Sequence, residues 1–350
     1  MSAPAYAPLD DALEVLSPYG PDLTNGNFNH APMVVEALCA LGRPAAVFPW
    51  IEAYRARLTP RPRAGEPVDW SRWRDYLGQR DSFPQWSRLF AGELAEAPWC
   101  SVLDRWAMRL APGYSAAATH GAIRVGHAVR GLAESETRVR LRELADALAS
   151  WAASYGELPT ASVAATAARL SPRAALAALP VVPSERRPPG NIVTSLNRLV
   201  DLPGFASTID LVDPGDDLDA AVGELAELFT RIYLANAVDT RTFIVFVHAV
   251  TAVHALGNML PHVSERSARL LARYAWQAGC GLYAAFGGAP PKEAIEAGDD
   301  DAEALVDQAV ANGDEHVVKF TEASIARHKI APSPVYLAAI RHALGIVRRR

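Results

Sequence analysis

Apolar residues recur along most of this chain with the three-to-four-residue spacing of an α-helix. A clear case covers residues 33–41, where the apolar positions share one helical face. Asn29 suits the start of this helix as a cap, Pro32 suits its first turn, and Gly42 ends it. A preceding loop, dense in turn residues, delivers His30 to the beginning of the helix.

The same periodicity predicts helices through most of the remaining sequence. They cover residues 8–18, 45–58, 114–151 in two segments, short alanine-rich pieces of 160–180, 218–236, 240–262, 264–286, 301–312, 314–328 and 333–347. No segment alternates convincingly with period two, so strands are few or absent. The pattern predicts an all-α fold, with residues 1–350 forming a single large multi-helix domain. The proline-rich stretch at about 180–190 is then a long loop, and a domain boundary there is the alternative.

Composition narrows the classes of protein to which the chain can belong. The net charge of −5 provides no basic stripe, so we expect no nucleic-acid partner. Three widely spaced cysteines form neither a disulfide framework nor a zinc pattern, and they fit a reducing cytoplasm. The N-terminus has no charged and apolar leader, and the apolar run near residue 245 is interrupted by His248 and His254. We therefore expect a cytoplasmic protein that does not associate with membranes.

Several common catalytic motifs are missing from the sequence. It has no Gly-x-Gly-x-x-Gly after a strand, no phosphate-binding Walker A loop and no Gly-x-Ser-x-Gly elbow. NADPH stays open as a cofactor, but no motif in the sequence supports it. No residue is assigned a catalytic role from sequence.

Histidines provide the strongest chemical signal. His30, His120, His248 and His316 each lie in a different predicted helix with apolar surroundings. One histidine on an apolar face is usually a core residue, but imidazole is also the commonest side-chain ligand of iron and zinc. Four such histidines favour a metal site between helices.

Lys319 lies one helical turn after His316, in a chain that has only three lysines. No carboxylate accompanies the histidines at a standard spacing such as Glu-x-x-His. A buried lysine that loses its proton can react with carbon dioxide, and the resulting carbamate is an anionic oxygen ligand. The alternative, equally weighted from spacing alone, is a surface ion pair of Lys319 with Glu315 or Glu322.

Aromatic residues concentrate between Trp70 and Trp106. Core packing is the favoured interpretation of this segment. The alternative is that some of these rings line a pocket and stack on a flat aromatic ligand.

Four segments of this sequence, taken in order, resemble successive blocks of the questin oxidase-like family. They are Gly26-Asn27-Phe28-Asn29-His30-Ala31-Pro32-Met33, Thr119-His120-Gly121-Ala122-Ile123-Arg124, His248-Ala249-Val250-Thr251 and Asp314-Glu315-His316-Val317-Val318-Lys319. The family includes fungal enzymes that open an anthraquinone ring by inserting oxygen, a Baeyer–Villiger-like outcome, in secondary metabolism. The chain is shorter than those enzymes, and the likeness is loose around His127.

The resemblance implies an all-helical oxygenase with a mononuclear non-haem Fe(II) centre. Its ligands would be His30, His120, His248, His316 and a carbamylated Lys319. The implied partners are dioxygen and a small polycyclic aromatic or quinone-type substrate, which undergoes C–C bond cleavage. Two alternatives stay open, namely a metal-independent NADPH-linked oxidoreductase of the same fold and a non-catalytic helical binding protein.

Three further residues are candidates for supporting the metal ligands rather than binding the ion themselves. They are Asn29, Thr251 and His127. His254 lies about 120° round its helix from His248, so both cannot easily face one ion. The sequence does not determine the substrate, a reductant, carbamylation of Lys319 or the oligomeric state.

Overall fold

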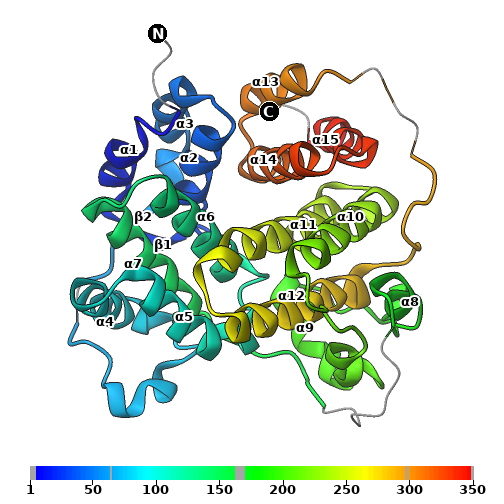
Figure 1. Cartoon of the computed structure of the whole chain (residues 1–350), viewed down its shortest axis with the longest axis horizontal. Helices are drawn as coiled ribbons and strands as arrows, with labels where there is room; N and C mark the ends of the chain where they lie inside the picture. The colour runs from blue at the N-terminus through cyan, green and yellow to red at the C-terminus, as the bar shows by residue number, and fades with distance from the viewer. Residues whose placement is uncertain (1–4, 64, 162–169, 296–297, 299, 348–350) are drawn as a thin grey trace.

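The computed structural model describes residues 5–63, 65–161, 170–295, 298 and 300–347 of the chain. Its α-helices are α1 (Leu9–Leu16), α2 (Ala31–Ala40), α3 (Val47–Tyr54), α4 (Phe83–Glu96), α5 (Trp99–Leu110), α6 (His120–Glu134), α7 (Arg138–Ala153), α8 (Pro172–Ala177), α9 (Ile192–Asn197), α10 (Leu218–Asn236), α11 (Thr240–Met259), α12 (Glu265–Phe286), α13 (Ala302–Asn312), α14 (Glu315–Ile330) and α15 (Pro334–Ile346). Short 3-10 turns connect many of them. The prediction of an all-α fold is confirmed (Figure 1).

Two short strands, β1 (Tyr19–Leu23) and β2 (Leu58–Pro60), pair antiparallel near the start of the chain. Gly26, with φ of +78°, makes the turn that follows β1, and a bridge between Asp22 and Phe28 closes it. A side chain at this φ would be strained, which explains the glycine. The strand pair and the turn fix the loop that ends at His30.

Predicted and observed helix boundaries agree for α10, α13, α14 and α15 to within a few residues. A difference occurs before α6, because the helix begins at His120 and residues 114–119 form turns instead. The alanine-rich stretch 160–180 contains α8, while residues 162–169 lie outside the described part of the chain. The proline-rich loop contains the 3-10 turn Ser184–Arg186.

Four helices form a closed ring in which each packs against two others: α2 on α6, α6 on α11, α11 on α14, and α14 on α2. Figure 1 shows α11 within the body of the protein, with α14 and α6 on different sides of it. Helices α6 and α11 approach so closely that a Cβ added to Gly126 would lie 2.6 Å from Ala255 Cβ. Only a glycine leaves room for this contact.

Helix α11 and the turn after it, Thr240–His262, are long and apolar enough to cross a membrane by length and composition. However, 83% of the most apolar stretch is buried against the rest of the protein. The segment therefore has the character of a core helix, as its interrupted apolar pattern predicts.

Candidate metal centre

Four histidines from the four helices of the ring meet at one point. His30 Nε2 lies 2.8 Å from His120 Nε2, which in turn lies 3.1 Å from His248 Nε2. The His316 ring is 4.7 Å from that of His30 and 5.4 Å from that of His248, centroid to centroid. The structure thus brings together all four histidines selected from sequence.

Local structure sets the orientation of two of these imidazoles. His248 Nδ1 lies 2.6 Å from the Ile244 carbonyl oxygen one turn back in α11. His120 Nδ1 makes a short contact with the Ala117 carbonyl oxygen. A carbonyl only accepts, so Nδ1 carries the hydrogen in both rings, and each neutral ring presents the lone pair of Nε2. The two Nε2 atoms are 3.1 Å apart, and their lone pairs face each other.

Three of the four histidines have their pKa values lowered by their surroundings. Burial, and after it the charge of Lys319, lowers the pKa of His30 and of His120 well below the ordinary value. Burial, followed by the neighbouring His120, does the same to the pKa of His248. Neutral imidazole is the form that binds a metal ion, so these three rings are in the metal-binding form at neutral pH.

The geometry fits a single metal ion. Two imidazoles bound at adjacent coordination positions through bonds of about 2.1 Å place their nitrogens about 3.0 Å apart. The observed separations of 2.8 and 3.1 Å match that distance. Among the described residues, His30, His120 and His316 have nitrogens that all lie within 4.8 Å of one another. His248 is outside this group of three and adjoins it through the 3.1 Å contact with His120 Nε2. In addition, His30 Nδ1 is buried with no hydrogen-bond partner in the described part of the chain.

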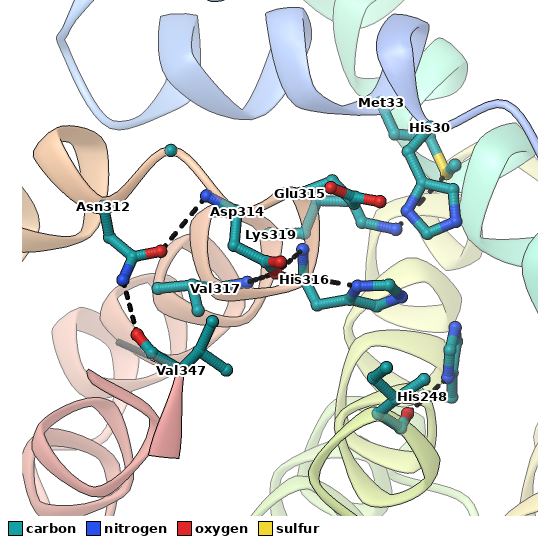
Figure 2. A network of polar contacts seen from close by, with 12 residues as sticks. His30, Met33, His248, Asn312, Asp314, Glu315, His316, Val317, Lys319 and Val347 are labelled. Atoms are coloured by element: carbon teal, nitrogen blue, oxygen red, sulfur yellow. Dashed lines mark hydrogen bonds and ion pairs between the residues drawn. The ribbon is translucent and has the colours of Figure 1, made fainter. Parts of the chain in front are cut away.

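Lys319 is buried beside this cluster, and its Nζ lies 3.9 Å from Met33 Sδ (Figure 2). Burial lowers the pKa of Lys319 to about 8, although Glu315 and Asp314 act in the opposite direction. The surface ion pair with Glu315 or Glu322 is therefore wrong. Glu315 instead binds Arg57 through two hydrogen bonds of 2.7 and 2.9 Å.

The nearest acidic side chains are engaged elsewhere. Asp314 accepts hydrogen bonds from the backbone of α14 and lies 3.6 Å from His316 Nδ1 (Figure 2). Among the described residues, the group of side chains close enough together to bind one metal ion contains only histidines. A divalent ion there would have no anionic protein ligand unless Lys319 were modified.

Strained backbone leads into His120. The three preceding residues, Ala117, Ala118 and Thr119, have φ of 47°, 57° and 71°. Left-handed backbone costs a non-glycine residue about 1–2 kcal/mol. It turns the Ala117 carbonyl back to the His120 ring, as the contact with Nδ1 shows. Sequence reasoning missed this turn, because alanine gives no signal for positive φ.

A cavity of about 410 Å³ opens onto the four imidazoles. Its apolar lining includes Phe28, which stacks on His120 with 4.9 Å between ring centroids, and Ile244. The tryptophans of 70–106 do not line it, so the pocket interpretation of that segment is wrong for this cavity. Trp70, Trp73 and Trp86 instead meet the buried Trp106 edge-to-face, and core packing is confirmed for Trp86 and Trp106, which are fully buried. Trp73 also lines a separate cavity.

A comparison with protein families matches residues 28–324 to the model described as questin oxidase-like. The chain belongs to the questin oxidase-like family. Its membership indicates an oxidoreductase of oxygenase type. A comparison with curated proteins found no match.

In this questin oxidase-like chain, a second polar layer lies deeper in the same ring of helices. Glu36, His127, His254 and Glu322 follow the four cluster histidines by six or seven residues in α2, α6, α11 and α14. At about 1.5 Å per residue, the layers lie about 10 Å apart. Since the later residue is the deeper one in every helix, all four helices run in the same direction away from the imidazoles.

Arg130 joins this polar layer. Its guanidinium donates to both Glu36 oxygens, at 2.6 and 2.7 Å, and to Glu322 Oε1. His127 Nδ1 lies 2.6 Å from Glu36, and His254 Nε2 lies 3.1 Å from Glu322. Arg130 holds the pKa of Glu36 at about 2 and that of Glu322 well below its usual value, against the opposing effect of burial.

The three candidate supporting residues have other contacts. Asn29 binds the Gly20 carbonyl at 2.8 Å and accepts from the Ala31 amide. Thr251 donates to the carbonyl of Val247 within its own helix. His127 belongs to the deeper polar layer, so none of the three has a hydrogen bond to a cluster imidazole among the described contacts.

Proposed function

We propose that this protein is a non-haem iron-dependent oxygenase acting on a polycyclic aromatic or quinone-type substrate. The reaction would insert oxygen with C–C bond cleavage, a Baeyer–Villiger-like ring opening. One observation carries the proposal, namely the facing Nε2 lone pairs of His120 and His248, 3.1 Å apart at the end of a cavity. Two acceptors so close repel each other unless a cation lies between them.

His30, His120, His248 and His316 would hold the ion, and bound iron would supply the redox chemistry with dioxygen. The Ala117 and Ile244 carbonyls orient two of these rings by accepting their Nδ1 hydrogens. Phe28 covers one face of His120 and limits the access of water to it. The cavity volume of about 410 Å³ is in the range of small-molecule sites.

Lys319 would provide the missing anionic ligand as a carbamate. With a pKa of about 8, the amine is partly neutral at physiological pH, where it can attack carbon dioxide. The new N–C bond forms a carbamate, and the amine releases a proton. Three helix N-termini, those of α2, α6 and α14, begin at the cluster, and their dipoles favour a negative group there.

Metal content after anaerobic reconstitution with Fe(II) is the direct test. We expect near-stoichiometric iron in the wild type, strong loss in His120→Ala and His248→Ala, and no loss in His328→Ala, a matched histidine outside the cluster. Isotopically labelled bicarbonate should give a carbamate signal that is absent in Lys319→Met. The proposal fails if the wild type retains no iron and its melting temperature is unchanged by Fe(II) and by chelator.

The same samples separate the two alternatives. Oxygen uptake that requires NADPH and persists under strong chelation would favour the metal-independent oxidoreductase. A protein that binds an aromatic ligand, but neither iron nor NADPH, would favour the non-catalytic binding protein.

A further inference from the structure

The charges on the cavity wall are opposite in sign to the charge of the chain. The lining includes Arg57, Arg80 and Arg241 but only one carboxylate, that of Glu315, which gives a balance of +2. The chain as a whole carries −5. The arginines therefore give the wall of the cavity a positive balance of side-chain charge.

The three arginines differ in whether their charge is already compensated. Arg57 is engaged by both oxygens of Glu315, and Arg80 forms an ion pair with Asp22. Arg241 has no ion pair with any carboxylate of the described residues. Its one hydrogen bond there goes to the Gly190 carbonyl at 3.2 Å.

Arg241 interacts with its neighbours without forming an ion pair to a described carboxylate. Its charge contributes to lowering the pKa of Asp239, after the hydrogen bonds from Thr242. The closest acidic residue in sequence, Asp239, uses its carboxylate to cap α11 by accepting from the Thr242 amide at 2.7 Å. The guanidinium carbon lies 5.7 Å from the centre of the Phe286 ring, so one face is supported by an aromatic side chain. Arg187 is close enough for the charge of Arg241 to contribute to lowering its pKa, behind burial and against the effect of Glu185.

The position of Arg241 along α11 sets a distance to the metal centre. Arg241 precedes His248 by seven residues, and Ile244 lies between them, with all three lining the cavity. Seven residues correspond to about 10.5 Å along the helix axis, close to two turns, so the side chains share one face. This separation suits the long axis of a fused aromatic ring system lying over Ile244.

We infer that the substrate carries a carboxylate at the end remote from the imidazoles, and that Arg241 is the residue that binds it. The planar guanidinium presents two parallel N–H donors that match a carboxylate and distinguish it from a neutral amide. Arg80 lines the same cavity and adds a second positive charge to it, although Asp22 is paired with it. This inference rests on the proposed function, because it names the substrate class of that site.

Calorimetric titration under anaerobic conditions, where no turnover occurs, tests it with two probes. Anthraquinone-2-carboxylate and anthraquinone-2-carboxamide have the same shape and differ in charge. We expect the wild type to bind the acid at least about tenfold more tightly than the amide, the range of one charge-assisted hydrogen-bonded contact. Added salt should reduce this preference, because the cavity mouth is exposed to solvent.

Substitutions test whether Arg241 is the source of the preference for the acid over the amide. Arg241→Met should bind both probes with nearly equal affinity, and Arg241→Lys should restore part of the difference. Arg266→Met, which removes an exposed arginine of α12 outside the cavity, should behave as wild type. Arg241 makes no ion pair with a described residue, so its replacement should leave folding intact.

Two results would overturn the inference in different ways. Equal affinity of the wild type for acid and amide, or an undiminished preference in Arg241→Met, would remove the carboxylate site and leave the proposed oxygenase standing. Binding of neither probe would contradict the substrate class in the proposed function itself, and the inference would fall with it.

Discussion

Replacing Arg130 with methionine should be among the most destabilising single substitutions in this protein. The guanidinium lies between two carboxylates, Glu36 and Glu322, whose side chains are each only 3% exposed. Methionine is unbranched, uncharged and shorter, so the substitution keeps the apolar stem, removes the cation and leaves both carboxylates buried. The ring of helices that carries the cluster histidines would lose its deeper polar contact.

The size of the effect follows from the cost of uncompensated buried charge. Removing one partner of a buried ion pair costs about 3–5 kcal/mol. Here two carboxylates lose their partner, but Tyr6 still donates to Glu36 at 2.6 Å, and His254 lies beside Glu322 and can take up a proton. Burial and Arg130 now contribute to a lowered pKa of His254, so loss of the arginine favours that proton. We therefore expect a loss of about 3–5 kcal/mol at pH 7, not twice that.

Urea unfolding followed by circular dichroism measures the change. Arg138→Met, which removes an exposed arginine of α7, is the control and should change the unfolding free energy by less than about 0.5 kcal/mol. The triple variant Glu36→Gln, Arg130→Met, Glu322→Gln has a neutral layer and should recover most of the lost stability. The reasoning is refuted if Arg130→Met lies within about 1 kcal/mol of wild type, or if the triple variant is no more stable than the single one.

Three other expectations follow from the same structure. Because the pKa of Glu36 is depressed to about 2, its ionised form contributes about 3 kcal/mol to the free energy of unfolding. This contribution is complete above pH 4.5 and is lost as the pH falls towards 2. In urea unfolding at a series of acid pH values, the difference in unfolding free energy between wild type and Glu36→Gln should shrink over that window. Gly126→Ala should destabilise by about 1–3 kcal/mol, since its Cβ meets Ala255, whereas Gly92→Ala, with open space in α4, should be neutral or stabilising; thermal melts compare them. Ala118→Gly relieves a positive φ, so its melting temperature should not fall, and a clear decrease would contradict strain in this turn.

Hydrophobic periodicity alone determined the fold class and most of the helices. In α10 and α13 the predicted ends are within one residue of the observed ones, because capping residues such as Asp217 and Gly313 mark them locally. The start of α6 was missed, since the backbone of residues 117–119 is set by contacts with other helices. Sequence also selected the four histidines and Lys319, which the fold brings together, while their roles as metal ligands stay predictions.

Only the tertiary structure decided which polar residues of different helices form ion pairs and hydrogen bonds with one another. Glu36 and Glu322 look like ordinary helix charges in sequence, and Arg130 like one arginine among many. Their partnership exists only because α2, α6 and α14 lie in one ring and run in the same direction, which no local pattern encodes. The repeated offset of six or seven residues after each histidine was a usable signal, but it acquires meaning only when the four helices are known to be neighbours.

The same reason explains the cavity. Periodicity identifies which face of α11 is apolar, and therefore that His248 points inward, because that depends on residues within one helix. It does not show that Arg57, Arg80 and Arg241 surround the same space, because they come from segments far apart in the chain. Charges that are distant in sequence act on each other only through the short distances that folding creates, and those distances are a property of the packed structure.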